Sequence, residues 1–421
     1  MNPPPEGEGV VLQRRERLNA LLAVMPTIQE LPPAYVYDES RILQMARLLD
    51  RARTASGCRI LYSIKSFPFA PVLRLLDALV DGFSVSSLFK ARQAKAVGSG
   101  SVHITTPGLR REEMDEIGSL CSFVAFNSFE QFSRLLPLLG DHASPGLRIN
   151  PKLSFLDDRR YDPCGAFPKL GVPLDALREA LQDDRLLASR LKGLHFHNAF
   201  SSRSFAPLQK TVDRIEEALA HWLPRIEWLN LGGGYLFETE ADLTGLCEIA
   251  RDLRRRWDLE VYFEPGKALV GRAGYLVASV IDLFESDGQP VAILDTTVNH
   301  HPEVFEYQIR PEPVWAEPEQ GWTAILAGCT CLAGDVFGSY RFERPLAVGD
   351  RVAFRNVGAY SLIKANRFNG YDLPAIYAWD GGEQLRRMKS YGFEEYASQW
   401  TADGEAPLDY YSRNGKKHPT P

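Results

Sequence analysis

The stretch WLNLGGG (228–234) joins a short apolar, strand-like run to three consecutive glycines. It comes late in a series of eight such runs, most of which end at residues able to take part in chemistry. Segments with helical periodicity separate the runs, and eight alternating strands and helices predict a (β/α)8 barrel of the TIM type. The runs are RILYSIK (59–65), GFSVSS (82–87), VHITT (102–106), FVAFNS (123–128), GLRINP (146–151), GLHFHNA (193–199), WLNLGGG (228–234) and VYFEPG (261–266).

The position of the glycines separates two candidate folds. An open, doubly wound sheet is the main alternative, and it would place a glycine-rich phosphate loop after its first strand. Here Gly232, Gly233 and Gly234 follow the seventh run, where a barrel places a phosphate site. Glycines let backbone N–H groups approach an anion closely, although a tight turn alone would also use them.

The character of the chain changes after residue 270. Strand-like runs separated by Gly, Pro and Asp then dominate, which predicts a second, β-rich domain with a sandwich or barrel architecture. The Pro- and Gly-rich stretch 152–175 predicts a loop over the barrel mouth. We therefore expect an N-terminal extension joining the β-rich domain (1–33), the barrel (34–268), the β-rich domain (269–400) and a polar tail (401–421).

The composition excludes several functional classes. The 421 residues are 45% hydrophobic and 24% charged, as in ordinary globular proteins. Because 48 Lys and Arg face 54 Asp and Glu, the net charge of −6 disfavours nucleic acid or an anionic membrane as a partner. No apolar run is long enough for a membrane span, and the N-terminus has no signal-peptide layout. The six scattered cysteines favour a reducing, cytoplasmic location, and their spacing favours no metal site.

Several residues with chemical potential follow the barrel runs. Lys65 ends the first run, where desolvation would lower its pKa and make it a usable amine, unless it simply extends to solvent at the rim. Glu264 ends the last run and could pair with a protonated ring nitrogen or cap a turn. His195 and His197 share one face of their strand, and each is either a packed core residue or a ring stacked on a cofactor.

The carboxyl ends of all barrel strands meet at one mouth. The amine, the glycines, the carboxylate and an imidazole would therefore surround one site. Together they match the needs of pyridoxal 5′-phosphate, whose aldehyde binds an amine, whose phosphate binds backbone N–H groups and whose ring acts as an electron sink.

These residues carry a resemblance to a known family. The chain resembles the fold-type III pyridoxal-phosphate decarboxylases, the alanine-racemase-like barrels, and within them the carboxynorspermidine (carboxyspermidine) decarboxylases. The resemblance extends from about residue 34 to residue 380. YSIKSF (62–67) and FEPG (263–266) are shared by the whole superfamily. The stretches specific to the branch are YDPC (161–164), CLAGDV (331–336) and FNGYDLPAI (368–376).

The resemblance implies a role for each matching residue. Lys65 would hold the cofactor as a Schiff base, His197 would stack on the pyridine ring, and Glu264 would pair with the ring nitrogen. Cys331 would enter from the second subunit of a homodimer with shared active sites, and would protonate the substrate α-carbon after carbon dioxide leaves. The residues implied to hold the phosphate are Gly232, Gly233, Gly234, Gly266 and Tyr360, and the predicted substrate contacts are Asp335, Asp295 and Arg203.

The chain departs from the branch at positions that would affect the choice of substrate. After His197 the branch continues with a Leu-Cys-Glu type segment, whereas this chain reads NAFSSR (198–203). The segment after Asp295 is one residue shorter, and Lys267 replaces an acid where it could help to bind phosphate. Arg203 could bind an acidic group of the substrate, or it could be a solvent-exposed loop residue.

The predicted function is α-decarboxylation of a diamino or polyamine-like amino acid. The closest match is conversion of carboxynorspermidine or carboxyspermidine to norspermidine or spermidine. One alternative is a decarboxylase of the same fold that acts on another amino acid or carboxylated amine in a secondary-metabolite or siderophore pathway. The other is a non-catalytic homologue that binds the cofactor or a polyamine and regulates a partner. A racemase fits less well, because the CLAGD loop offers Cys331 instead of a second base such as tyrosine.

Overall fold

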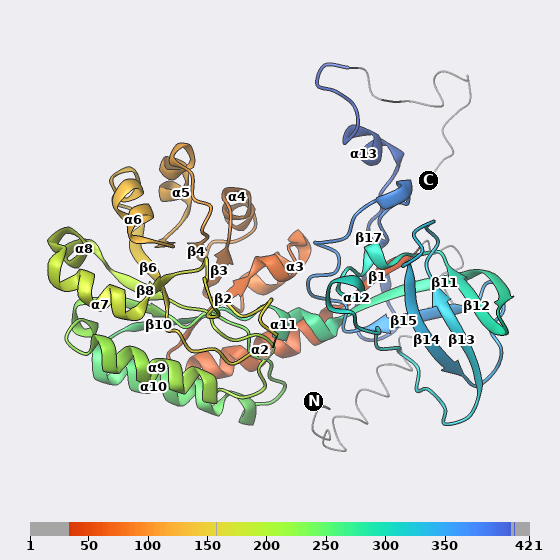
Figure 1. Cartoon of the computed structure of the whole chain (residues 1–421), viewed down its shortest axis with the longest axis horizontal. Coiled ribbons are helices and arrows are strands. Elements are labelled where there is room, and N and C mark those ends of the chain that lie inside the picture. The colour runs from red at the N-terminus through yellow and green to blue at the C-terminus, as the bar shows by residue number, and fades with distance from the viewer. Residues whose placement is uncertain (1–32, 157, 406–407, 409–421) are drawn as a thin grey trace. The chain divides into compact units, whose positions relative to one another are not determined.

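The computed structural model describes residues 33–156, 158–405 and 408. The chain divides into two compact units, one of residues 41–271 and one that combines the chain up to Ser40 with the chain from Arg272 onward. We call them the barrel unit and the β unit. Figure 1 shows strands surrounded by helices in the barrel unit and a set of twisted strands in the β unit. Of the predicted N-terminal extension (1–33) and polar tail (401–421), the structure describes residues 33, 401–405 and 408.

Parallel strands close the barrel. In the described chain the sheet has nine strands in the order β5-β4-β3-β2-β10-β9-β8-β6-β7, and the pairing of β5 with β6 closes a ring of eight that leaves out the short β7 (Val172–Pro173). Each of the eight predicted runs forms one of these strands, so the predicted barrel is confirmed. The strands are β2 (Arg59–Ser63), β3 (Gly82–Val85), β4 (Ser101–Thr105), β5 (Phe123–Phe126), β6 (Ser144–Asn150), β8 (Gly193–His195), β9 (Trp228–Asn230) and β10 (Glu260–Phe263).

Amphipathic helices connect and cover the strands. Serine caps begin two of them: the Ser87 hydroxyl accepts the N–H of Lys90, and the Ser128 hydroxyl accepts the N–H of Gln131. The helices are α2 (Glu39–Ser56), α3 (Ala70–Asp77), α4 (Leu88–Val97), α5 (Met114–Leu120), α6 (Phe129–Leu135), α7 (Leu174–Asp183), α8 (Arg185–Arg190), α9 (Ala206–Leu219), α10 (Thr244–Trp257) and α11 (Lys267–Val270).

A layer of aromatic side chains fills the barrel interior. The His103 ring lies 4.0 Å from the Phe123 ring and 4.4 Å from the Tyr262 ring, measured between centroids. Trp228 completes the layer, and a Cβ atom on Gly193 would lie 2.0 Å from its indole, so only glycine fits there. Because Phe123 and Trp228 begin their strands, this layer packs the amino-terminal half of the barrel and leaves the opposite end for a site.

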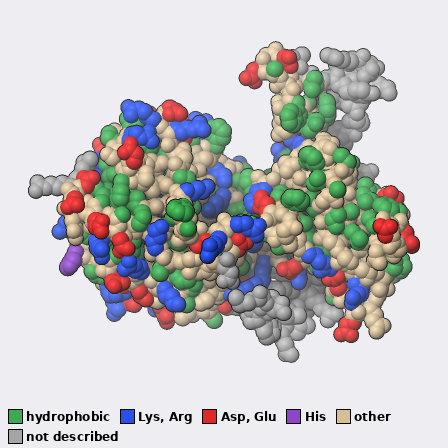
Figure 2. All heavy atoms as spheres, in the orientation of Figure 1, with side chains coloured by type: hydrophobic (Ala, Val, Ile, Leu, Met, Phe, Trp, Pro, Cys, Tyr) green, Lys and Arg blue, Asp and Glu red, His purple; other side chains and the backbone are tan. Residues whose placement is uncertain are grey.

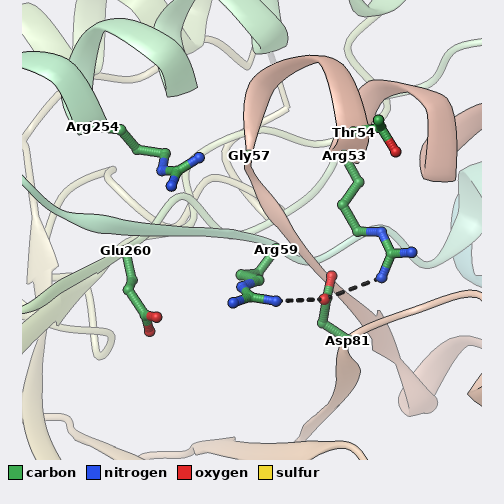
Figure 3. A pocket seen from close by; sticks show the side chains of 7 residues that line it. All are labelled: Arg53, Thr54, Gly57, Arg59, Asp81, Arg254 and Glu260. Carbon is green, nitrogen blue, oxygen red and sulfur yellow. Dashed lines mark hydrogen bonds and ion pairs between the residues drawn. The ribbon is translucent and has the colours of Figure 1, made fainter.

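Charged side chains surround a cavity of about 310 Å³ in the barrel unit (Figure 3). Asp81, just before β3, accepts hydrogen bonds from Arg53 and Arg59, each at 3.2 Å, and from the backbone N–H of Ile60 at 2.8 Å. These contacts join α2, β2 and the segment before β3. Since Arg59 begins β2, the cluster lies at the amino-terminal face of the barrel. Residues at this face are expected to stabilise the fold, because barrel active sites lie at the opposite, carboxyl-terminal face.

The β unit contains one branched sheet. In the described residues its strands follow the order β14-β13-β12-β11-β1-β16-β17, and β15 pairs with β11. This confirms the predicted β-rich second domain. Its elements are β1 (Ala34–Asp38), β11 (Gly274–Ser286), β12 (Gln289–Leu294), α12 (Glu303–Tyr307), β13 (Trp322–Ala327), β14 (Val336–Phe342), β15 (Arg351–Arg355), β16 (Ala375–Trp379), β17 (Leu385–Lys389) and α13 (Phe393–Ser398).

The first described strand differs from the prediction, which began the barrel at residue 34. β1 lies in the β unit, antiparallel to β11 and parallel to β16. The alternation of its side chains explains this placement: Tyr35 packs into one hydrophobic cluster of the unit, and Ala34 and Val36 pack into the other. All five residues of β1 are buried, so both of its faces are covered.

The surface carries both signs of charge. Basic and acidic side chains are interspersed over the described barrel unit on the face shown in Figure 2. No described helix combines the length and the apolar character that crossing a bilayer requires.

Candidate active site

A second cavity, of about 230 Å³, lies at the carboxyl ends of the barrel strands. Three predicted residues, Lys65, His197 and Glu264, line it together. This volume is below that of typical ligand pockets, which exceed about 300 Å³. The other lining residues are Ser63, Ser84, Val85, Ser86, Thr105, Arg148, Tyr161, Pro163, Leu170, His195, Ala199 and Phe200.

Lys65 follows β2 in a short 3-10 turn, Ile64–Ser66. The Lys65 side chain keeps an exposed surface at the cavity, although the protein atoms around it partly desolvate the amine. This desolvation lowers the pKa of Lys65 below its ordinary value, the positive charge of Arg148 lowers it further, and Glu264 partly opposes the shift. Such a lysine loses its proton, and so supplies a nucleophilic amine, more readily than a fully solvated lysine.

Glu264 is buried directly after β10. Asn230 Nδ2 donates to its Oε1 at 2.8 Å, and His195 Nε2 lies 3.4 Å from its Oε2. Burial by itself raises the pKa of Glu264, but His195, Lys65 and Asn230 outweigh it and hold the pKa below the ordinary value. Burial lowers the pKa of His195, so its neutral ring donates a hydrogen bond to an ionised carboxylate.

The glycine turn brings three segments into close contact. A Cβ atom on Gly233 would lie 2.1 Å from the carbonyl oxygen of Glu264, and one on Gly234 would lie 2.0 Å from the carbonyl oxygen of Ala199. Gly234 also has a φ of +94°. No side chain fits at either position, so the turn requires glycine there, although its glycines are not among the residues that line the cavity of Lys65.

His197 is held by this turn. Its Nδ1 accepts the backbone N–H of Gly233 at 3.0 Å. Burial lowers its pKa well below the ordinary value, and the charges of Lys65 and Arg148 add to this shift. The ring is therefore neutral and fixed in orientation beside Lys65.

Arg148 was not among the predicted site residues. It belongs to β6, and its side chain lines the cavity with Lys65 and Glu264. Burial lowers its pKa, whereas the Glu264 carboxylate raises it. A charged residue within the apolar run GLRINP was the available signal. Tyr161 and Phe200 were also missed, because they come from loops without periodicity.

Arg203 does not line the cavity. Its Nη1 lies 3.7 Å from Glu238 Oε1, and the side chain is 47% exposed. Arg41 contacts the same carboxylate at 3.6 Å. Contact between Arg203 and an acidic substrate therefore stays a prediction.

The β unit holds the other predicted residues. Cys331 is exposed, whereas the carboxylate of Asp335 is buried and accepts the backbone N–H groups of Val298 at 2.8 Å and Thr330 at 3.1 Å. These bonds organise the loop that carries Cys331. Burial raises the pKa of the nearby Cys329 thiol to about 11, which keeps it protonated at neutral pH. The predicted contact between Asp335 and a substrate amine is not tested by these bonds.

Asp295 and Tyr360, two further predicted site residues, are both affected by burial. Asp295 follows β12 and accepts the N–H of Ser279 at 2.8 Å. Burial raises the pKa of Asp295 and raises that of Tyr360 to about 12. The roles of both residues toward substrate and phosphate stay predictions. Within the described residues, no group of three or more His, Cys, Asp and Glu side chains could hold a metal ion.

Comparison with known proteins identifies the family. The family model described as "Pyridoxal-dependent decarboxylase, C-terminal sheet domain" matches residues 34–358. The chain therefore belongs to the pyridoxal-dependent decarboxylases, which confirms the predicted class of enzyme.

Individual relatives narrow the similarity to one branch. The chain is 32% identical over 368 residues to the carboxynorspermidine/carboxyspermidine decarboxylase of Herminiimonas arsenicoxydans, covering 87% of this chain and 98% of that protein. It is 33% identical over 381 residues to the carboxyaminopropylagmatine decarboxylase of Synechocystis sp., covering 89% and 97%. The crystal structure of carboxynorspermidine decarboxylase complexed with norspermidine from Campylobacter jejuni matches with a TM-score of 0.79 at 28% identity, covering 87% of this chain and 99% of that chain. These matches confirm the resemblance expected from the sequence.

Proposed function

We propose that this enzyme removes carbon dioxide from the α-carbon of carboxynorspermidine or carboxyspermidine and releases norspermidine or spermidine. The observation that carries the proposal is one cavity in which Lys65, with its lowered pKa, faces the hydrogen-bonded carboxylate of Glu264 beside the neutral ring of His197. The substrate is proposed from the two relatives that carry this activity in their names.

The residues present fit pyridoxal 5′-phosphate. The cofactor needs an amine for its aldehyde, and Lys65 lies in the cavity with a lowered pKa. It needs backbone N–H groups for its phosphate; because those of Gly232 and Gly233 donate to Asn230 Oδ1 and His197 Nδ1, we assign the phosphate to Gly234 and the segment at Gly266. It needs an anion for its ring nitrogen, and Glu264 is ionised. When bound, pyridoxal 5′-phosphate supplies an electron-withdrawing ring that accepts the electron pair left by carbon dioxide.

Three residues of the barrel would then have distinct roles. Lys65 would provide the amine to which the cofactor attaches. Glu264, held by Asn230 and His195, would keep a proton on the ring nitrogen. His197, oriented by Gly233, would lie beside the ring and help to exclude water from it.

Cys331 would deliver the proton to the α-carbon from the partner subunit of a homodimer. Its loop, organised by Asp335, presents the exposed thiol. Exposed apolar side chains occur on this loop and elsewhere in the β unit, and hydrophobic side chains are visible over that unit in Figure 2. Such exposure is typical of a surface that another protein covers. The side chains are those of Phe305, Leu332, Val336, Ile363, Phe368 and Tyr371.

A second candidate substrate carries a guanidinium group in place of the terminal amine. The Synechocystis relative, named for carboxyaminopropylagmatine, is as similar to this chain as the relatives named for carboxynorspermidine. Both substrates share the reacting end, so the residues around Lys65 would treat them alike.

Mass spectrometry on the purified holoenzyme tests the reaction. We would offer carboxynorspermidine, carboxyspermidine, carboxyaminopropylagmatine, meso-diaminopimelate, ornithine, lysine and arginine, and measure loss of carbon dioxide. Loss from the carboxylated polyamines supports the proposal. Loss only from a short amino acid, or from none of the compounds despite bound cofactor, contradicts it and favours the other-substrate or the binding-only alternative.

Lys65→Ala should abolish the visible absorption of the bound cofactor and carbon dioxide release together, because no other amine would replace Lys65. The matched control is Lys95→Ala, which removes an exposed lysine from α4 and should leave both signals unchanged. An active, coloured Lys65→Ala variant would disprove the role of Lys65.

A further inference from the structure

Two aromatic rings from different loops meet at the barrel cavity. Tyr161 belongs to the loop between β6 and β7, and Phe200 belongs to the segment after β8. Their rings are stacked, with centroids 5.5 Å apart and planes inclined by 13°. Both line the same cavity as Lys65 and Glu264. We call Tyr161 and Phe200 the aromatic pair.

The backbone that carries Phe200 is tied to the glycine turn. The N–H of Ser202 donates to the carbonyl of Gly234 at 2.9 Å, and the N–H of Leu236 donates to the carbonyl of Ser202 at 2.7 Å. Asn198 Nδ2 donates to Thr211 Oγ1 at 2.8 Å and holds the other end of the segment. The position of Phe200 is therefore coupled to the turn proposed to hold the phosphate.

The loop that carries Tyr161 is also anchored, and its ring already contacts a cation. Asn150 Nδ2 donates to the carbonyl of Pro163 at 3.1 Å, close to Tyr161. The guanidinium carbon of Arg160 lies 5.3 Å from the centroid of the Tyr161 ring, so this cation already occupies part of that ring, and Phe200, which is 40% exposed, offers the accessible surface of the pair. Such contacts are favourable because the faces of aromatic rings carry negative charge density.

The cavity offers a cationic tail little negative charge. Among its described lining residues Glu264 is the one carboxylate, and Asn230 and His195 already bind it. Lys65 and Arg148 contribute positive charge to the same cavity. Because the cavity measures only about 230 Å³, a substrate tail several methylenes long must extend along the residues at the mouth. The surfaces there that suit both methylenes and protonated amines are the two rings.

We infer that the aromatic pair is the specificity-determining element that receives the methylene chain and the protonated secondary amine of the substrate tail. This inference rests on the proposed function and deepens it. Phe200 lies in the segment NAFSSR (198–203), which contains no carboxylate, so a ring surface is what this segment offers to a cationic tail.

Ligand titration of the holoenzyme tests the aromatic pair without turnover. We would add norspermidine, and separately propylamine, which has the reacting amine but no tail. The dissociation constants would be read from the visible absorption of the bound cofactor and from calorimetry. The variants are Phe200→Leu, Tyr161→Leu and the conservative Tyr161→Phe. The matched control is Phe167→Leu, which removes a fully exposed ring from the same loop as Tyr161.

We expect a loss of affinity only for the ligand that carries the tail. Phe200→Leu and Tyr161→Leu should raise the dissociation constant of norspermidine by about three- to thirtyfold, while that of propylamine stays constant. Tyr161→Phe and Phe167→Leu should bind norspermidine like the unmodified enzyme. Unchanged norspermidine affinity in Phe200→Leu, or an equal loss for propylamine, would overturn the inference.

The two proposals fail in different ways. Absence of carbon dioxide release from carboxynorspermidine by the unmodified enzyme refutes the proposed reaction. A loss of norspermidine affinity confined to the Phe200 and Tyr161 variants would still support the aromatic pair in that case.

Discussion

At the scale of single residues, the chemistry of the barrel cavity depends on how a few side chains control one another's charge. Desolvation lowers the pKa of Lys65, and Arg148 adds to this shift, whereas Glu264 opposes it. Asn230 and His195 in turn keep Glu264 ionised in a buried position. Lys65 therefore loses its proton more readily than a fully solvated lysine, while Glu264 keeps its charge despite burial.

Glu264→Gln should shift the titration of Lys65 toward lower pH. Glu264 raises the pKa of Lys65, so removing its charge lets desolvation and Arg148 lower that pKa further. The rate of cofactor attachment to the apoenzyme, followed by visible absorption across pH, would show the shifted midpoint. In the holoenzyme kcat should fall by about a hundredfold, because the ring nitrogen loses its anion.

The control for this experiment is Glu116→Gln, which alters an exposed pair with Arg92. It should change neither the midpoint nor kcat. An upward shift of the midpoint in Glu264→Gln would mean that Glu264 does not stabilise the protonated amine of Lys65.

His103 should make the protein less stable in acid. Burial among Phe123, Trp228 and Tyr262 lowers its pKa from 6.5 to about 3, and its Nε2 has no hydrogen-bond partner within the described residues. The unfolded chain therefore binds one more proton at this position between about pH 3 and 6.5, so stability falls as pH decreases through that window.

His103→Leu should flatten this dependence by up to one proton, about 1.4 kcal/mol per pH unit, in urea unfolding at pH 4 to 7. His221→Leu removes an exposed histidine and should retain the slope. Equal slopes in His103→Leu and the unmodified protein would contradict the expectation.

At the scale of elements, the two ends of the barrel carry different kinds of residues. The carboxyl ends of the strands hold the residues of the cavity, and the amino-terminal face holds the ion-pair cluster around Asp81 (Figure 3). Asp81 is 10% exposed and accepts three donors, so it is buried more deeply than most surface ion pairs. It connects α2 to β2 where the barrel begins.

Asp81→Ala should lower the free energy of unfolding by about 1–3 kcal/mol, because the Ile60 N–H and two guanidinium groups lose an acceptor. Asp175→Ala, which breaks an exposed pair with Arg214, should cost less than about 1 kcal/mol. Urea unfolding measures both values, and kcat should be unchanged in each variant. Equal costs would show that burial does not strengthen the Asp81 cluster.

At the scale of the whole molecule, the predicted site uses residues from both units. Lys65 lies in the barrel unit, and Cys331 lies in the β unit on a loop accompanied by exposed apolar side chains. If Cys331 acts in the site of the partner, then a dimer contains two sites, each built from both chains.

Mixing two inactive variants tests this arrangement. Lys65→Ala and Cys331→Ser homodimers should each have little activity. After dissociation and random reassociation, half of the dimers would be mixed, with one intact site of two, so activity should recover to about a quarter of that of the unmodified enzyme. Recovery would be measured as carbon dioxide release. Activity that stays at the level of the separate variants would contradict sites shared between subunits.

The sequence predicted the strands of the barrel better than it predicted the position of the first described strand. Each barrel strand was predicted, because every strand is a short apolar run that needs only local information to be recognised. The strand Ala34–Asp38 was assigned to the wrong unit, since AYVYD is equally compatible with a barrel strand and with a strand buried between β11 and β16. Its partners lie more than two hundred residues away.

The sequence by itself determined the fold class, the family and the presence of Lys65, His197, the glycine turn and Glu264 at strand ends, because local periodicity and short motifs encode these features. Only the tertiary structure decided which side chains control them. The bonds of Asn230 and His195 to Glu264, the place of Arg148 in the cavity and the stacking of Tyr161 on Phe200 arise when the barrel closes. Closure brings together residues from separate strands and loops, and their hydrogen bonds, burial and charge have no counterpart in the linear chain.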